Sequence, residues 1–369
     1  MKRNYKIGSL FCLVLLMFYG TNGISQLDLP RGSQMATVSQ RIGITDISIV
    51  YSRPAVKERE IWGKLVPYGM NNLGFGTAKE SPWRAGANEN TIIKFTDDVK
   101  IEGKPLSAGK YGLHMIVNEN NTATIIFSNN YEAWGSYFYE PSEDALRVDV
   151  DTKDRSHMEE LTYLFTEAKK NSVVASLNWE KKQIPFSIEV DVTDIVLADI
   201  RHKLQNFPGF SRQTWEQAAN FSLNNGGDLD EALGWINAAI EGQFFSQKNF
   251  NNLSVKSRIL TNQGKTAEAE AVMDEALGLA TILEVHGYGR QLIAQGKKEK
   301  ALEVFKMNAK KHKGLWPVDY GMARGYSAMG QYKSALKHLK IAANRAPDKI
   351  NKDAIAANII KLENGTDIN

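Results

Sequence analysis

A glycine-to-alanine spacing recurs four times in the second half of the chain and constrains its fold more than any other feature. The pairs are Gly227/Ala232, Gly264/Ala269, Gly296/Ala301 and Gly330/Ala335. In a helical hairpin the glycine lets the chain turn after the first helix, and a small alanine on the second helix lets the two helices approach closely. A step that repeats every 32 to 37 residues therefore predicts a solenoid of stacked hairpins that binds a partner.

Residues of characteristic size recur around these pairs. The position four after each alanine is large and apolar, and the position seven before the last three glycines is small. The large residues are Ile236, Met273, Phe305 and Leu339, and the small ones are Ser257, Gly289 and Ala323. At these residues the range 211–347 resembles the tetratricopeptide repeat family, which implies paired helices around a concave, protein-binding surface. An unrelated all-helical bundle is the alternative.

Three arginines share one position of the repeat. Arg258, Arg290 and Arg324 each lie six residues before the glycine, and Tyr320 and His286 lie four residues before two of them. In the family this position faces the concave surface, so the resemblance implies a column of three guanidinium groups. Arginine binds carboxylates through a bidentate fork, which suits an acidic peptide or another anionic partner. The alternative is that each arginine pairs with an acidic residue on a neighbouring helix.

The first half of the chain has a different periodicity. In Thr45–Ser52 apolar and polar residues alternate, and similar short runs follow, several of them separated by glycine and asparagine turns. The last two of these runs are Val173–Trp179 and Ile184–Val190. Many short strands with little helix between them predict an antiparallel β-sandwich or jelly roll over residues 30–192. The period then changes to that of a helix, which predicts a helical repeat domain over 193–362. We expect a disordered tail over 363–369, and an α+β, multidomain chain as a whole.

Four runs in the first half carry a second resemblance. They are Ser52–Gly69, Trp83–Phe95, Gly103–Ile116 and Trp134–Tyr139. In this order they are similar to a secreted bacterial family known as domain-of-unknown-function family 2911, over about residues 30–190. The resemblance implies a fold but no activity. The segment Met70–Ser81 is an insertion between two of these runs, and it bears on the shape of any neighbouring site.

The most polar and aromatic cluster of the first half is Trp83, Arg84, Asn88 and Glu89. Small residues between them leave the backbone accessible, as a loop that approaches a ligand requires. The cluster therefore favours a carbohydrate or small-ligand site as a second hypothesis. The alternative is that Arg84 and Glu89 fix a sharp turn while the tryptophans belong to the core.

No recognised catalytic or metal-binding motif is present. The six histidines are scattered without ligand spacing, and the sequence lacks nucleophile elbows and phosphate-binding loops. We therefore predict no catalytic residue, no metal and no cofactor. A hydrolase using Glu89 or His114 as acid or base, with Arg84 holding an anionic substrate, is the third hypothesis.

The N-terminus has the pattern of a secretory signal peptide over residues 1–25. Basic residues precede an apolar run, and Gly23–Ser25 offers a cleavage site. Removal of this segment takes away three basic groups, so the 45 Lys and Arg become 42, equal to the 42 Asp and Glu. A neutral mature chain gives no argument for nucleic-acid binding. The single cysteine, Cys12, lies within the segment, so the mature chain would contain no disulfide.

Together these patterns predict an exported, non-catalytic scaffold of the bacterial envelope, located in the periplasm or outside the cell. It has no membrane span after cleavage, and its helical repeats capture a protein or peptide.

Overall fold

The computed structural model describes residues 29–369, which divide into two compact units between Val192 and Thr193. The predicted signal peptide lies outside the described residues. Within the described range, no helix combines the length and the apolar character needed to cross a membrane.

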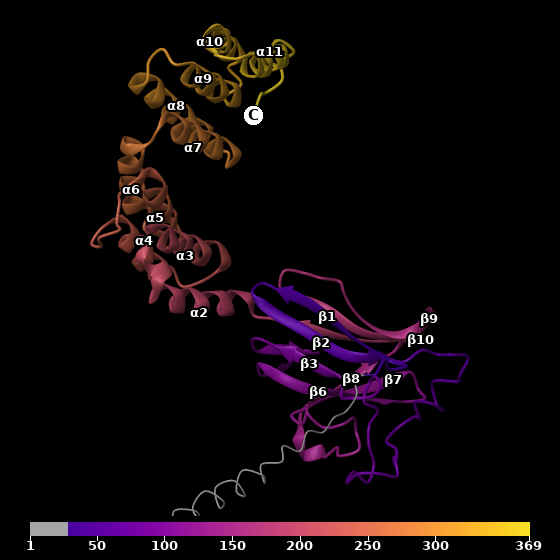
Figure 1. The fold of residues 1–369 in the computed structure, drawn as a ribbon. Coiled ribbons are helices and arrows are strands. Elements are labelled where there is room, and N and C mark those ends of the chain that lie inside the picture. The colour runs from indigo at the N-terminus through magenta and orange to yellow at the C-terminus, as the bar shows by residue number, and fades with distance from the viewer. Residues whose placement is uncertain (1–28) are drawn as a thin grey trace, which may run out of the picture. The chain divides into compact units, whose positions relative to one another are not determined.

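The first unit consists of two antiparallel sheets (Figure 1). A six-stranded sheet has the order β1-β2-β3-β6-β7-β8, and a four-stranded sheet has the order β5-β4-β10-β9. The strands are β1 Gln34–Ile42, β2 Thr45–Arg53, β3 Ile92–Phe95, β4 Val99–Ile101, β5 Lys104–Leu106, β6 Gly109–Val117, β7 Thr122–Ser128, β8 Asp144–Asp151, β9 Lys153–Thr166 and β10 Ser172–Glu189.

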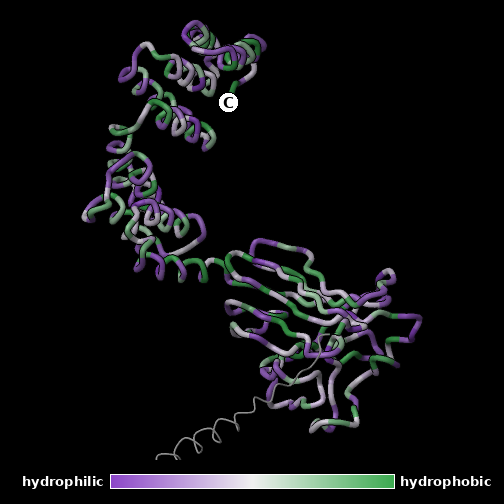
Figure 2. The backbone as a smooth tube through the Cα atoms, viewed as in Figure 1, coloured by the Kyte–Doolittle hydropathy of each residue, from purple (hydrophilic) through white to green (hydrophobic). Residues whose placement is uncertain are grey.

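The alternation read from the sequence explains how the sheets pack. Hydrophobic and hydrophilic residues are interspersed along the strands (Figure 2), and in β2 Ile47 and Ile49 are fully buried. Rings from the two sheets meet between them. Tyr51 on β2 lies 4.8 Å from Tyr163 on β9, and Phe127 on β7 lies 6.0 Å from Phe186 on β10. The predicted antiparallel sandwich is therefore confirmed.

One strand differs from its prediction. The sequence pattern predicts separate strands over Val173–Trp179 and Ile184–Val190, but the structure contains the single strand β10 of 18 residues. Its pairing with β9 shifts register on both sides of Glu180, whose φ is 52°. Such a bulge bends a strand without ending it, so the polar residues in the middle of β10 do not form a loop.

The second unit is a series of helices (Figure 1). They are α2 Val192–Leu204, α3 Arg212–Asn225, α4 Leu229–Ile240, α5 Phe250–Asn262, α6 Thr266–Leu279, α7 Ile282–Ala294, α8 Lys298–Lys311, α9 Trp316–Ala328, α10 Tyr332–Arg345 and α11 Lys349–Glu363. Four hairpins form, α3/α4, α5/α6, α7/α8 and α9/α10, as the recurring spacing predicts. The alanines of all four pairs are buried.

The turn glycines have the expected backbone in three of the four hairpins. Gly264, Gly296 and Gly330 have φ between 72° and 79°, which a side chain rarely tolerates. In the first hairpin Gly226 takes this conformation instead, with φ 77°. Gly227 is needed for space, because a Cβ there would lie 2.4 Å from Ser222 Oγ.

The last residues differ from the disordered tail expected over 363–369. Ile368 is buried, with 6% of its surface exposed, and it packs in a cluster with Ala323 and Leu362. Asp367 accepts a hydrogen bond of 2.6 Å from Ser327 on α9. These contacts join positions far apart in sequence, so no local sequence pattern records them. We call residues 364–369 the closing segment.

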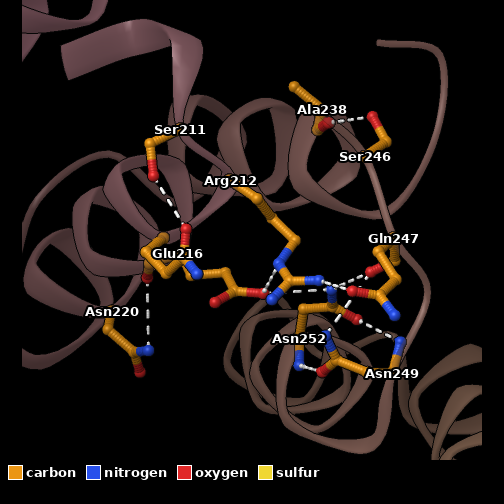
Figure 3. A network of polar contacts seen from close by, with 10 residues as sticks. Ser211, Arg212, Glu216, Asn220, Ala238, Ser246, Gln247, Asn249 and Asn252 are labelled. Carbon is orange, nitrogen blue, oxygen red and sulfur yellow. Dashed lines mark hydrogen bonds and ion pairs between the residues drawn. The ribbon is translucent and has the colours of Figure 1, made fainter. Parts of the chain in front are cut away.

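A polar network fixes the loop between α4 and α5 (Figure 3). Arg212 lies 3.2 Å from Glu216 and donates to Gln247, and Asn252 donates to both Glu216 and the Gln247 carbonyl. The same loop exposes 81% of Phe244. The loop is thus ordered by polar contacts while an aromatic side chain stays at the surface.

Two glycines of α7 provide a test of this packing. A Cβ at Gly289 would lie 2.4 Å from the buried ring of Phe305, whereas a Cβ at Gly287 would meet nothing within 4 Å. We expect Gly289→Ala to lower the free energy of unfolding by about 1–3 kcal/mol through overpacking. Gly287→Ala should raise it by up to about 1 kcal/mol, because alanine is the better helix former. Urea unfolding followed by circular dichroism measures both, and equal effects would contradict the packing described.

Candidate functional site

The first helices of the hairpins line the inner side of the arc that the second unit forms (Figure 1). Arg258 lies on α5, Arg290 on α7 and Arg324 on α9. We call this side of α5, α7 and α9 the inner face. It brings three of the five predicted residues, His286, Tyr320 and Arg324, into one cluster and leaves Arg258 and Arg290 outside that cluster.

The cluster is built from stacked rings and one guanidinium group. His286 and Tyr320 stack with their centroids 5.8 Å apart and their planes 4° apart. The guanidinium of Arg324 lies 4.9 Å from the Tyr320 ring centre and donates to its hydroxyl at 3.3 Å. These contacts fix the direction of Arg324, because a cation is attracted to an aromatic face.

None of the three arginines has a carboxylate within ion-pair distance among residues 29–369. Arg258 donates to the amide oxygen of Asn224 on α3 at 2.7 Å. Arg290 is exposed and makes no hydrogen bond or ion pair with another described residue. The described contacts therefore do not show the alternative arrangement, in which each arginine pairs with an acidic neighbour.

The closing segment occupies the inner face beside Arg324. Arg324 donates to the Ile368 carbonyl at 3.2 Å and to the Asn369 side chain at 3.3 Å. The Ile368 amide donates to Ser327 Oγ at 3.1 Å. Sequence reasoning missed Ser327 and this segment, since no local pattern relates residue 368 to α9.

Two polar atoms of the cluster are buried without a hydrogen-bond partner among the described residues, His286 Nδ1 and Arg324 Nε. Burial, together with the charges of Arg324 and Arg290, lowers the pKa of His286 to about 4. The ring is therefore neutral at physiological pH. The positive charge of the cluster belongs to Arg324.

The first unit contains a second candidate site, a cavity of about 370 Å³. Of the residues predicted from the sequence, Trp83, Arg84 and Asn88 line it. Glu89 does not line it, and instead pairs with Arg31. Burial opposes ionisation of Glu89, but the hydrogen bond and charge of Arg31 hold its pKa below the usual value. Arg59 also lines the cavity, and sequence reasoning did not single it out.

Arg84 is held by neutral groups. It donates to the Asn88 carbonyl, and its guanidinium lies 5.0 Å from the centre of the Tyr137 ring. Gly135 allows this position, because a Cβ there would lie 2.4 Å from Arg84 Cζ. The turn thus depends on Arg84, as the structural alternative supposes, while no acidic residue within residues 29–369 forms an ion pair with it.

His114 is not arranged as a strong base. It is buried, and its Nδ1 lies 2.9 Å from Ser136 Oγ. Burial, reinforced by the charge of Arg84, lowers its pKa to about 4. A base of such low pKa takes a proton from a serine poorly at neutral pH. Glu89 is ion-paired with Arg31.

The low pKa of His286 predicts a pH dependence of stability. Between pH 6.5 and about 4 the unfolded histidine binds a proton that the folded one does not. The free energy of unfolding should therefore fall as the pH decreases through this range, by up to about 3 kcal/mol. Urea titrations that follow the helical circular dichroism signal measure this. His286→Phe should flatten the dependence, whereas the exposed control His202→Gln should not; equal slopes in all three proteins would contradict the burial of His286.

Comparison with solved structures finds tetratricopeptide repeat proteins. The C-terminal part of a repeat-containing protein from Cytophaga hutchinsonii is 13% identical, covers 47% of this chain and 70% of its own, and has a TM-score of 0.32. YrrB, described as having an unusual peptide-binding site, is 17% identical, with coverage of 45% and 84% and a TM-score of 0.27. A repeat protein from Parabacteroides merdae is 15% identical, with coverage of 47% and 80% and a TM-score of 0.23.

No curated protein matches the sequence. The comparison with family models gives a match to the first unit. Residues 33–188 match the family described as a protein of unknown function (DUF2911), which confirms the resemblance carried by the four sequence runs.

Proposed function

We propose that the protein is a non-catalytic scaffold that binds an extended protein or peptide segment along the inner face. One observation carries this proposal: the closing segment is itself a peptide bound there. Arg324 and Ser327 contact its main chain at the Ile368 carbonyl and amide. Main-chain contacts of this kind do not depend on side-chain identity, so another extended segment could make them.

The charges of the inner face favour an acidic partner. Arg290 has no hydrogen bond or ion pair within the described chain, and Arg324 keeps a buried Nε without a partner. Guanidinium groups bind carboxylates through charge-assisted hydrogen bonds, which are stronger than neutral ones. Complementary charge also speeds association and disfavours basic competitors. An acidic segment that runs from Arg324 towards Arg290 would use both groups.

We further propose that the protein acts after export, in the periplasm or outside the cell. The support is the sequence of residues 1–25, where basic residues, an apolar run and small residues follow one another. A scaffold that recruits a partner in the envelope is consistent with a neutral mature chain.

A charge-neutralising substitution tests the role of Arg290. We expect Arg290→Gln to release partners that the wild type retains from envelope extract, because a charged hydrogen bond worth about 1.5–3 kcal/mol is lost. Folding should be unchanged, since the side chain has no polar partner to lose among the described residues. Quantitative mass spectrometry of the retained proteins gives the measurement.

Lys340→Gln is the matched control, because it removes the same charge from an exposed position on α10, the second helix of its hairpin. Partners kept by this control and lost by Arg290→Gln would support the proposal. If Arg290→Gln retains the same proteins in the same amounts, the inner face is not the binding surface.

The closing segment should compete with the partner. Asp367 accepts from Ser327 at 2.6 Å and from the Asn369 side chain at 2.7 Å. Asp367→Ala removes these bonds and a third from the Asn369 amide, and it should loosen the segment, so partner retention should rise several-fold. The control is Asp353→Ala, which removes an exposed carboxylate paired with Lys349 on the same helix. Unchanged or reduced retention by Asp367→Ala would show that the partner does not need the place of the segment.

A further inference from the structure

We propose that the cavity of the first unit binds a small organic anion with a flat, apolar body. The cavity has a volume of about 370 Å³, within the range of small-molecule sites. This proposal does not depend on the function proposed for the inner face, since all its residues belong to the first unit.

The charge of the lining points to an anion. Arg59 and Arg84 line the cavity, and none of the lining residues is acidic. Arg59 donates to the carbonyls of Val56 and Ala55, and Arg84 donates to the Asn88 carbonyl. Each guanidinium has five N–H donors, so both keep donors for a ligand. Because no carboxylate in the lining balances these two cations, the cavity favours a ligand that carries a negative charge.

The rest of the lining points to a flat, apolar body. Trp83 and Trp179 both line the cavity, and they stack with their centroids 6.0 Å apart and their planes 17° apart. Pro54, Val66 and Pro82 add apolar wall. A ring of the ligand can lie against such a surface, while the arginines bind its charged end. Ligand pockets usually combine an apolar lining with a few polar groups that fix the orientation of the ligand.

The backbone near both arginines is held in an uncommon conformation. Lys57 and Glu58, immediately before Arg59, have φ of 47° and 59°, and Ala85 and Asn88, close to Arg84, have φ of 50° and 60°. Residues other than glycine rarely adopt such angles. The Ala85 strain is maintained by hydrogen bonds to its carbonyl from Tyr163 and Thr91. Strain of this kind concentrates where a side chain must be aimed.

The sequence runs that carry the family resemblance meet at this cavity. The first run supplies Arg59, the second Arg84 and the fourth Ser136. The third supports the second, because Trp83 and Met115 exchange two backbone hydrogen bonds, of 2.9 and 2.8 Å. Runs that are dispersed over more than 80 residues of sequence therefore come together around one cavity.

The insertion Met70–Ser81 shapes the same wall. Asn71, Leu73 and Ser81 line the cavity, and Ser81 donates to the Ser136 carbonyl at 2.7 Å. Gly76 packs so closely on the Tyr137 backbone that a Cβ would lie 2.0 Å from its carbonyl oxygen. This segment thus sets part of the selectivity for the body of the ligand.

Isothermal titration calorimetry of the full chain tests the proposal with three matched probes: a naphthoate, the corresponding naphthyl phosphate and the neutral naphthamide. We expect the anions to bind with micromolar to millimolar dissociation constants, as is usual for small ligands. The amide should bind at least about ten-fold more weakly, because it lacks the charge-assisted hydrogen bonds. The two anions distinguish a carboxylate from a phosphate ligand.

Arg84→Gln and Arg59→Gln should each weaken binding of the better anion about ten-fold or more and leave the amide unchanged. Arg59→Gln keeps the test decisive if Arg84→Gln fails to fold. Arg41→Gln is the matched control, since Arg41 pairs with Asp46 away from the cavity, and it should bind like the wild type. No binding by either anion, equal binding by the amide, or an equal loss in Arg41→Gln would overturn the proposal.

Discussion

The packing of one aromatic ring on three glycines positions helices α7, α8 and α9 of the second unit relative to one another. Phe305 on α8 is fully buried, and a Cβ at Gly289, Gly321 or Gly325 would lie within 3.0 Å of its ring. These glycines belong to α7 and α9, so the ring sets the distance between the two inner helices. That distance in turn allows His286 to stack on Tyr320 and Tyr320 to orient Arg324. The positions of the charged groups on the inner face therefore depend on this packing.

The sequence predicts those parts of the fold that rest on local spacing. A glycine turn, an alanine at the hairpin contact and a large residue one turn later define each hairpin, and the structure has them. The bulge at Glu180 and the docking of Ile368 are decided by contacts between distant positions, which no local period records. The same holds for the candidate sites. Arg84 belongs to a conspicuous cluster, whereas Arg59 reaches the cavity through the fold of a separate loop.

Both candidate sites share one electrostatic property. Arg290 and Arg324 on the inner face, and Arg59 and Arg84 at the cavity, all lie without a carboxylate partner among the described residues. Elsewhere arginines such as Arg41 and Arg201 pair with acidic residues at 2.7 Å. Arg84 and Arg324 are also oriented by neighbouring tyrosine rings, and such unpaired guanidinium groups are better suited to recognition than to surface solubility.

The closing segment has a consequence for the strength of any interaction at the inner face. Because it is tethered directly to α11, it is present at Arg324 at an effective concentration on the order of millimolar, whatever the protein concentration. A partner that bound Arg324 alone would have to displace the closing segment, which is present at that effective concentration. A partner that also engages Arg290 gains a contact that the segment does not make among the described residues. The tethered segment thus sets a minimum affinity for any partner, and long ligands reach it more easily than short peptides.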